Sequence, residues 1–470
     1  MKIQPSIQNT MEYMKQELRL GTNFDIIYRV FTIKDRTAVI YCIDGFTKDD
    51  MLEKLLQYMM DGIQDEFPAD AHEFSKTMLP YAEISLVEQY DTAIGSLLSG
   101  ISVLFIDGYE KGLTIDCRTY PARNVQEPDK DKVMRGSRDG FVETLVFNTA
   151  LIRRRIRDPK LTMEIHTAGR RSMTDVVVCY VEDRVDKKLL AEICKRIDRL
   201  EVDSLTMNQQ SLAECLFPYK WYNPFPKFKY TERPDAAAAA ALEGDIVILV
   251  DNSPSAMILP SSIFDIIEEA DDYYFPPITG TYLRLSRMII SILTLQLTPV
   301  WLLLVQNPQW MPGWLEFTII RDAVNVPIII QLLMLELAID GLRLAAVNTP
   351  NMLSTPLSVM AALVLGEFSV RSGWFNSETM LYMAFVAVAN YTQSSFELGY
   401  ALKFMRLLIL ILTAIFNVWG FVIGEILVIL AIVTNKTISG KSYIYPLFPF
   451  SWKKIKRTFF RARLPHTEKE

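Results

Sequence analysis

The alternation of hydrophobic and polar positions changes character near residue 282. Before this point, charged residues recur every few positions and short apolar runs are separated by turn residues. After it the apolar runs lengthen, and two of them, 288–305 and 407–433, are long enough to cross a bilayer core about 30 Å thick as helices. We therefore predict an α/β cytoplasmic N-terminal domain followed by an all-α polytopic transmembrane domain. The predicted regions are 1–282 for the soluble part, 283–434 for the membrane part and 435–470 for a basic cytoplasmic tail.

The soluble region shows both strand and helix patterns. Segments 103–117 and 245–259 each place two apolar runs around turn residues, which is typical of β-hairpins. Segment 140–159 repeats its apolar positions every three or four residues and stops at Asp158-Pro159, which predicts an amphipathic helix. A buried strand at 175–183 is followed by a helix at 186–203. These elements predict an α/β region with two subdomains.

The membrane region allows two topologies. Besides the two long runs, 356–370 and 380–389 are shorter and need flanking residues to span, and 326–344 is amphipathic. If 326–344 crosses the membrane and the last run folds into a hairpin at Gly420, the domain has six membrane elements. If 326–344 lies at the interface, the last run crosses once. The sequence leaves both arrangements open.

Charge sets the expected orientation. The N-terminal residues contain no apolar signal-peptide segment, which favours a cytoplasmic soluble domain. The tail at 451–463 is densely basic, and the positive-inside rule places it in the cytoplasm as well. Both termini on one side require an even number of crossings. The five cysteines lie upstream of the membrane region without metal-like spacing, so we interpret them as small core residues in a reducing compartment.

Carboxylates recur in the membrane half and form a candidate ion path. A charge in mid-membrane costs about 2.5–3.5 kcal/mol on the insertion scale, so such residues face protein or water. Because acidic residues outnumber the basic residues expected in the spans, and rings of Asp or Glu favour cations, a cation path is one interpretation. The candidates are Glu336, Asp340, Glu367, Glu397 and Glu425.

Each carboxylate also has a less specific interpretation. A hydrogen-bonded position in a packed bundle explains Glu425 as well as a pore role does, and an interfacial position is favoured for Glu336 and Asp340. Gly420 and Gly424, four residues apart, either permit close helix packing or mark a re-entrant hairpin.

Two basic clusters are candidate contact surfaces. The first could form a positive face for a partner or lipid, although a solvated helix face is favoured; its members are Arg153, Arg154, Arg155, Arg157, Arg170 and Arg171. The second lies just beyond the last apolar run, where each basic residue gains about 1 kcal/mol from anionic lipid. Its members are Lys453, Lys454, Lys456 and Arg457.

The sequence gives little support for catalysis. The segment 95–100, GSLLSG, has the glycine spacing of a phosphate-binding loop, but Ile101 stands where that motif needs lysine. His72, His166 and His466 are far apart in the sequence and match no metal or nucleophile motif. We therefore expect no enzyme activity, no cofactor, no metal site and no nucleic-acid partner.

Several motifs in order resemble the GerA family, the A-type subunits of bacterial spore germinant receptors. They include RGSRDGFVETLVFNTALIRRRIRDPKL, GRRSMTDVVVCYVED, TERPDAAAAAALEGDIVILVDNSP, DDYYFPP and SSFELGYALKFMRL. The match covers about residues 85–435. Three positions depart from the family pattern: Ser394 and Phe396 replace its proline and tyrosine, and Met173 replaces a lysine.

The resemblance implies a subunit of an inner spore membrane complex that helps a dormant endospore respond to nutrients. It implies partners, namely a B-type transporter-like subunit, a lipoprotein or a small membrane protein, and a homo-oligomer that conducts ions. Two hypotheses follow: a channel-forming subunit that releases cations during germination, and a non-conducting scaffold or signal-transmitting subunit. Secondary transport is disfavoured because the sequence shows no internal repeat.

Overall fold

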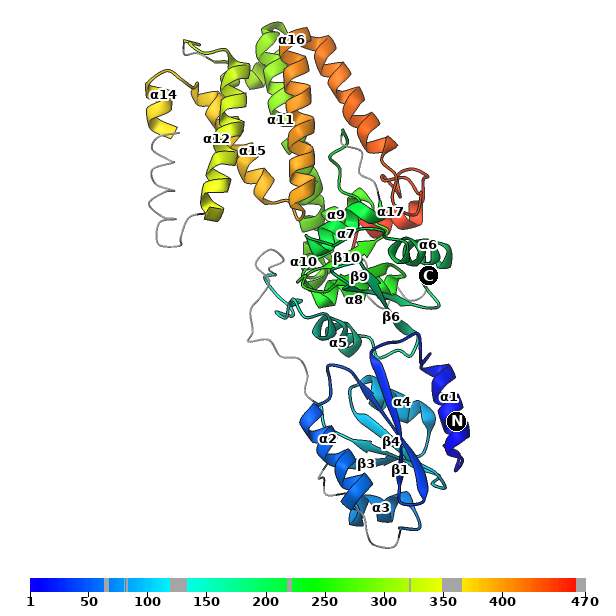
Figure 1. Ribbon diagram of the computed structural model, residues 1–470. Coiled ribbons are helices and arrows are strands. Elements are labelled where there is room, and N and C mark those ends of the chain that lie inside the picture. The colour runs from blue at the N-terminus through cyan, green and yellow to red at the C-terminus, as the bar shows by residue number, and fades with distance from the viewer. Residues whose placement is uncertain are drawn as a thin grey trace. The chain divides into compact units, whose positions relative to one another are not determined.

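The computed structural model describes residues 1–62, 67–79, 81, 83–118, 133–217, 222–320, 323–348 and 366–461 (Figure 1). The chain forms two compact units. Unit 1 comprises Met1–Pro218 and Phe228–Pro260, and unit 2 comprises Tyr219–Lys227 and Ser261–Glu470. Each unit has its own hydrophobic cores.

The first part of unit 1 is a five-stranded antiparallel sheet between two helical layers. Its strand order is β1-β2-β4-β5-β3. The strands are β1 (Ile26–Ile33), β2 (Arg36–Ile43), β3 (Ile84–Val87), β4 (Ser102–Ile106) and β5 (Gly112–Ile115). The helices are α1 (Ile7–Glu17), α2 (Asp49–Gln57), the π-turn η1 (Tyr58–Gly62), α3 (Ala71–Thr77) and α4 (Tyr90–Leu98).

Strand alternation determines which helices cover each face of this sheet. Val39 and Tyr41 of β2 share a core with α1 and α4. Ala38 and Ile40 alternate with these two residues along β2 and point to the other face of the sheet, where they share a core with α2 and α3. The predicted hairpin at 103–117 is confirmed as β4 paired with β5.

The second part of unit 1 is another antiparallel sheet, with strand order β6-β7-β9-β10-β8. The strands are β6 (Leu161–Ala168), β7 (Thr174–Val181), β8 (Lys229–Thr231), β9 (Ile246–Val250) and β10 (Ala256–Leu259). The helices are α5 (Leu145–Arg155), α6 (Lys187–Asp198), α7 (Asn208–Leu216) and α8 (Pro234–Glu243). The second predicted hairpin is confirmed as β9 with β10, and the predicted helix at 140–159 is the shorter α5.

One face of this second sheet packs against α5 and α8. The buried alanines Ala237, Ala238 and Ala241 of α8 lie in one core with α5 residues and with Val177 and Cys179 of β7. Their small side chains allow the helix backbone to approach the sheet closely. Helix α6 packs on β6, and α7 contacts α6 and β9.

Unit 2 is helical in its described residues. Its elements are α9 (Ile263–Ile267), α10 (Asp271–Tyr274), α11 (Pro277–Gln306), the 3-10 turns η2 (Pro308–Trp310) and η3 (Gly313–Thr318), α12 (Ile328–Asn348), α14 (Ser369–Arg371), α15 (Ser377–Tyr391), α16 (Phe396–Thr434) and α17 (Trp452–Phe459). Helix α11 packs on α15 and α16, and α12 also packs on both (Figure 1).

Two helices in the described part of unit 2, α11 and α16, are long and apolar enough to cross a membrane, by length and composition only. Helix α12 has 21 residues and carries charged side chains within its apolar sequence. Most of the apolar run predicted at 356–370 lies outside the described residues, because these stop at 348 and resume at 366.

The helix α16 is a hairpin of two helical arms. Asn417 interrupts it with φ 51° and ψ −126°, and the two arms meet at this residue (Figure 1). A residue other than glycine rarely adopts a positive φ, and this one marks the turn between the two arms. The sequence allowed a hairpin centred on Gly420; the structure places its tip three residues earlier.

The two glycines lie where the arms of α16 come closest. A Cβ atom at Gly420 would lie 1.8 Å from the backbone oxygen of Leu412, and one at Gly424 would lie 3.1 Å from Cα of Ile409. The glycines therefore permit close packing within the hairpin. Of the two roles considered for Gly420 from the sequence, this geometry fits close packing, and the hairpin tip lies at Asn417 instead.

Candidate functional site

A buried cluster of charges joins α12 to the first arm of α16. Nε of Arg406 donates to Oε1 of Glu336 at 3.0 Å, and Nη1 donates to the backbone oxygen of Thr294 on α11 at 2.8 Å. Nζ of Lys403 lies 3.4 Å from Oε2 of Glu336 and also forms an ion pair with Asp340. Glu336, Lys403 and Arg406 are each at most 4% exposed.

These contacts change the interpretation of the acidic residues. From the sequence, carboxylates were predicted to outnumber buried basic residues, and for this cluster that prediction is wrong. The interfacial position favoured for Glu336 and Asp340 stays a prediction. Glu336 is buried, and Lys403 and Arg406 balance the charges of Glu336 and Asp340. A buried ion pair is sensitive to loss of one partner, because the other charge then remains in a medium of low polarity.

A signal for this cluster was present in the sequence. Glu336 and Asp340 are four residues apart, and Lys403 and Arg406 are three apart, so each pair lies on one helix face. An acidic face on one apolar helix and a basic face on another predict complementary packing. The sequence analysis considered only the acidic members.

Glu425 lies on the second arm of α16 opposite α11. Its Oε2 accepts a hydrogen bond from Nε2 of Gln296 at 2.9 Å. Its Oε1 is buried and has no hydrogen-bond partner among the described residues. Glu425 therefore has one satisfied and one unsatisfied oxygen in an apolar hairpin, which distinguishes it from the ion-paired Glu336.

A reciprocal amide pair ties the hairpin tip to the end of α11. Nδ2 of Asn307 donates to Oδ1 of Asn417 at 2.6 Å, and Nδ2 of Asn417 donates back to Oδ1 of Asn307 at 3.2 Å. Asn307 is the residue that ends α11. The contact fixes the turn between the two arms against the helix on which both arms pack.

The two remaining carboxylates lie in separate environments. Glu367 forms an exposed ion pair with Arg371 at 2.6 Å, one helical turn away. Glu397 is in the first turn of α16, after the N-cap Ser395 whose hydroxyl accepts from the backbone N–H of Leu398. Among the five candidates, the described contacts bring together Glu336 and Asp340, through Lys403.

Part of the first basic cluster points into unit 1. Nε and Nη2 of Arg153 bind the two oxygens of Asp25 at 2.9 and 3.0 Å, and both side chains are almost fully buried. Arg155 pairs with Asp139. Arg153 is therefore neither a solvated residue nor a partner contact, which corrects both interpretations of its role. It had been grouped by sequence proximity, but adjacent helix positions point in different directions.

The other members of this cluster lie at the surface of unit 1. Arg154, Arg157, Arg170 and Arg171 are exposed. The side chain of Arg171 is 84% exposed, with its Nε 4.0 Å from Oδ2 of Asp203. A contact role for these exposed arginines stays a prediction.

The second basic cluster lies on α17 and its flanks. Lys453, Lys454, Lys456 and Arg457 are accompanied by exposed aromatic side chains, and those of Phe448, Phe450 and Trp452 are each at least 65% exposed. Charged and aromatic residues together on a short amphipathic helix are typical of a segment that lies at a membrane surface.

Arg284 of α11 holds the C-terminal end of α17. Its Nη1 donates to the backbone oxygens of Arg457 and Thr458 at 3.0 and 2.9 Å. The same guanidinium pairs with Glu268 and with the buried Asp272, whose other partner is Arg287. The basic helix is thus attached to the first turns of α11.

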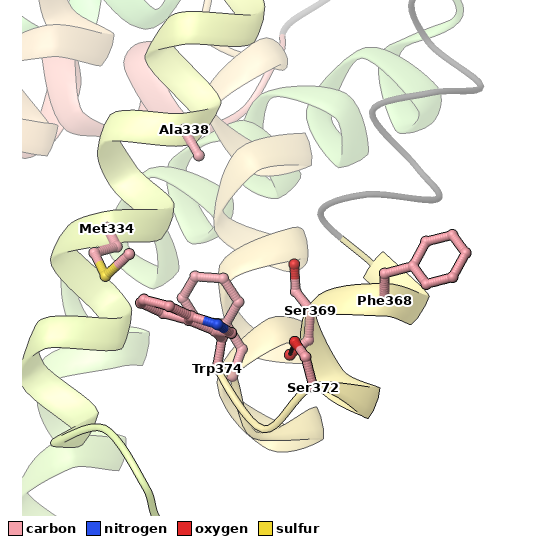
Figure 2. A pocket seen from close by; sticks show the side chains of 7 residues that line it. Met334, Ala338, Phe368, Ser369, Ser372 and Trp374 are labelled. Atoms are coloured by element: carbon pink, nitrogen blue, oxygen red, sulfur yellow. Dashed lines mark hydrogen bonds between the residues drawn. The ribbon is translucent and has the colours of Figure 1, made fainter.

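A shallow groove of about 570 Å³ borders α12 and α14. Figure 2 shows Trp374 between the helix that carries Met334 and the short α14 that carries Ser369. The lining is mainly apolar, with two serine hydroxyls. Among the described residues, no titratable side chain lines the groove, so these residues offer it no acid, base or metal ligand.

The chain combines an α/β unit with a helical unit that contains a long apolar hairpin. It therefore belongs to the class of two-part proteins in which an α/β region precedes helices long and apolar enough to cross a membrane. The chain belongs to the Bacillus/Clostridium GerA spore germination protein family, whose model matches residues 12–470. This confirms the family resemblance carried by the sequence motifs.

Individual relatives agree with the family assignment. The chain is 36% identical to stage V sporulation protein AF of Bacillus subtilis over 97% of this chain and 92% of that protein. The motifs TERPD, VDNSPS and LRLAAVNTP are the stretches by which the sequence looks most like this branch of the family. It is 28% identical to spore germination protein KA of Bacillus subtilis (98% and 85% covered) and 29% identical to spore germination protein GerLA of Bacillus cereus (96% and 93% covered).

One solved structure is similar to part of the chain. The crystal structure of the N-terminal domain of the A subunit of the Bacillus megaterium spore germinant receptor GerK3 aligns with 55% of this chain and 96% of that domain. The sequence identity is 24% and the TM-score is 0.41.

Proposed function

We propose that this chain is a membrane subunit of a spore germination complex that oligomerises into a cation-conducting channel and contributes to ion release from the germinating endospore. The observation that carries the proposal is Glu425, whose buried Oε1 has no partner among the described residues. In an apolar helix such a carboxylate needs water, an ion or another subunit nearby. An oligomer would repeat this carboxylate around its axis, and a ring of acidic side chains favours cations.

The membrane placement that supports this function has six elements. They are α11, α12, the run at 356–370, α15 and the two arms of α16. The hairpin at Asn417 supports this topology over the one in which the last run crosses once. An even number of crossings puts both termini on the same side. The basic tail favours the cytoplasmic side, which is the spore core side of the inner spore membrane.

The basic helix α17 supports the same orientation. Its lysines and Arg457 would lie against anionic headgroups of the inner leaflet, and the flanking aromatic residues would enter the interface. The lipid bilayer is therefore one partner. The others are copies of this chain and membrane subunits of the germination complex: a B-type transporter-like subunit, a lipoprotein or a small membrane protein.

We propose that this subunit has no enzymatic activity. The family consists of spore germination proteins, and the relatives carry names of that kind. The groups described above hold helices together or lie in an apolar hairpin, and they form no nucleophile with its base.

A second function, a non-conducting scaffold or signal-transmitting subunit, has its own support. The four charged side chains of α12 and α16 form ion pairs with one another. One of the two carboxylate oxygens of Glu425 already accepts a hydrogen bond from Gln296. Helices joined by such paired charges would transmit a movement to one another without conducting ions. Under this alternative ion flux belongs to a partner.

The test is potassium and sodium efflux from liposomes that contain the full chain, alone and with a candidate membrane partner. Glu425→Gln is compared with Glu367→Gln, which removes a carboxylate from an exposed ion pair. The proposal predicts flux with the wild-type chain, altered flux with Glu425→Gln and little change with Glu367→Gln at equal incorporation. If the chain alone carries no flux, and the flux seen with the partner is identical for all three proteins, the result would support the scaffold.

A further inference from the structure

Three side chains of metal-binding type converge on one face of the second sheet of unit 1. Glu164 and His166 are two residues apart on β6, so both point to the same side. Cys194 lies on α6, the helix that packs on β6. One ligand atom from each of the three residues lies within 4.8 Å of the others.

The separations are close to those in a coordination sphere. Sγ of Cys194 lies 3.7 Å from Oε2 of Glu164, and Nε2 of His166 lies 3.8 Å from the same oxygen. With zinc bonds of about 2.0–2.3 Å, a tetrahedral site places its ligand atoms about 3.3–3.5 Å apart. All three ligand atoms lie within 4.8 Å of one another, so the side chains have to move closer together to bind one ion.

The surrounding residues orient the ligand atoms toward the common centre. Nδ1 of His166 lies 2.7 Å from Oδ1 of Asp198, which leaves Nε2 for the centre. This Nε2 is buried and has no hydrogen-bond partner among the described residues. The hydroxyl of Tyr180 donates to Oε1 of Glu164, so Oε2 is the oxygen that faces Cys194. A carboxylate behind a metal-binding histidine is a common supporting contact.

Cys194 differs from the core cysteines of unit 1. Burial raises the pKa of Cys42 and Cys179 to about 12, so those thiols stay protonated in their cores. Cys194 is only partly buried and lies beside a histidine and a carboxylate. A soft thiolate, an imidazole and a carboxylate form a donor set that suits Zn²⁺.

We propose that Glu164, His166 and Cys194 bind one zinc ion, with the fourth position open to water or to a side chain of a partner. The sequence analysis left His166 without a role, because Cys194 is separated from it by the whole of β7 and no motif spacing connects them. The site would fasten α6 to β6 in the α/β unit. It is independent of ion conduction in unit 2.

The test uses the full chain purified in detergent with a tag that contains no histidine. After removal of metal with a chelator, the protein is titrated with Zn²⁺ and, separately, with Co²⁺. Bound metal is measured by mass spectrometry, and cobalt–thiolate coordination by its charge-transfer absorption. The test variants are Cys194→Ser, His166→Gln and Asp198→Asn. The matched controls are Cys215→Ser on α7 and His72→Gln on α3, which change the same residue types outside the cluster.

The proposal predicts one zinc per chain, and a charge-transfer band with Co²⁺ in the wild-type chain and in both controls. Cys194→Ser should abolish the band, and Asp198→Asn should weaken zinc binding about 10–100-fold, as expected for a supporting contact. If His166→Gln fails to fold, the nearly isosteric Cys194→Ser decides the question. A folded wild-type chain that binds no stoichiometric zinc, or a Cys194→Ser variant that binds zinc as tightly as wild type, would overturn the proposal.

Discussion

Arg406 on α16 and Glu336 on α12 form a buried ion pair, with Nε of the guanidinium 3.0 Å from Oε1 of the carboxylate. Arg406 is 1% exposed and Glu336 4%. The pair joins two helices that are distant in sequence, and Arg406 also binds the backbone oxygen of Thr294 on α11. Three helices of unit 2 therefore meet at one guanidinium.

Removal of one member of this pair should destabilise the helical unit. We expect Glu336→Gln to lower stability by about 3–5 kcal/mol, because the Arg406 guanidinium then stays buried without a carboxylate partner. Arg406→Met should cost less, because Lys403 still lies beside Glu336. The measurement is thermal unfolding of the full chain in detergent. The double variant Arg406→Met, Glu336→Leu should recover most of the loss, since an apolar pair often replaces a buried ion pair without cost. Single variants as stable as wild type would contradict the structural role.

Because the arms of the α16 hairpin are in close contact, replacing glycine by alanine should destabilise the chain at Gly420 but not at Gly341 of α12. Gly420→Ala should destabilise the chain by about 1–3 kcal/mol, because the added Cβ would collide with the backbone of Leu412. Gly341→Ala on α12 is the control, since a Cβ there meets nothing within 4 Å among the described residues. Both variants are compared by thermal unfolding and by protease resistance. Equal behaviour of the two variants would argue against the close contact between the arms.

The pair of Arg153 and Asp25 makes a parallel prediction in unit 1. Arg153→Leu should cost about 3–5 kcal/mol because it leaves the Asp25 carboxylate buried without its partner. Arg157→Gln, on the exposed side of the same segment, should change stability by less than about 0.5 kcal/mol. Thermal unfolding of both variants separates the two cases. A tolerated Arg153→Leu would place this arginine back among the surface candidates.

The basic helix α17 should respond to lipid charge. In nanodiscs with anionic lipid, amide hydrogen exchange in 452–459 should be slower than in nanodiscs with zwitterionic lipid, because Lys453, Lys454, Lys456 and Arg457 gain attraction to the headgroups. Substitution of Lys454 and Lys456 by glutamine should reduce the difference, and high salt should do the same. Helix α2 of unit 1 serves as the internal reference. If amide hydrogen exchange in 452–459 is the same with both kinds of lipid, α17 does not bind the headgroups and only packs against the rest of unit 2.

Hydrophobic periodicity predicted much of unit 1 because it reports on each element locally. The strand at 175–183 and the strands of the two hairpins are buried along almost their whole length, as their continuous apolar runs predicted. The helix at 186–203 buries Leu189, Ile193 and Ile197, which are four residues apart. The same pattern does not encode which distant side chain an element meets. Arg153 was therefore assigned to the surface, although its partner Asp25 precedes the first strand of the other sheet.

In unit 2 the sequence marked the unusual residues but not their partners. Glu425 and the two glycines were identified because a charge and small residues are conspicuous in an apolar run. Lys403 and Arg406 were missed because a buried ion pair forms between two helices, and the sequence of one helix does not show which residue of the other it meets. The hairpin tip at Asn417 could not be placed from composition, since Gly420 has the residue type that usually permits a turn, yet its role is close packing.

The most direct test of the account is the reversal potential of wild-type oligomers in a planar bilayer under a potassium chloride gradient. A cation path predicts a shift toward the potassium equilibrium potential, and Glu425→Gln should reduce this shift while Glu425→Asp retains it. Oligomers that insert but carry no current with any partner, or that carry current without cation preference in both the wild type and Glu425→Gln, would contradict the channel and leave Glu425 as a hydrogen-bonded packing residue beside Gln296.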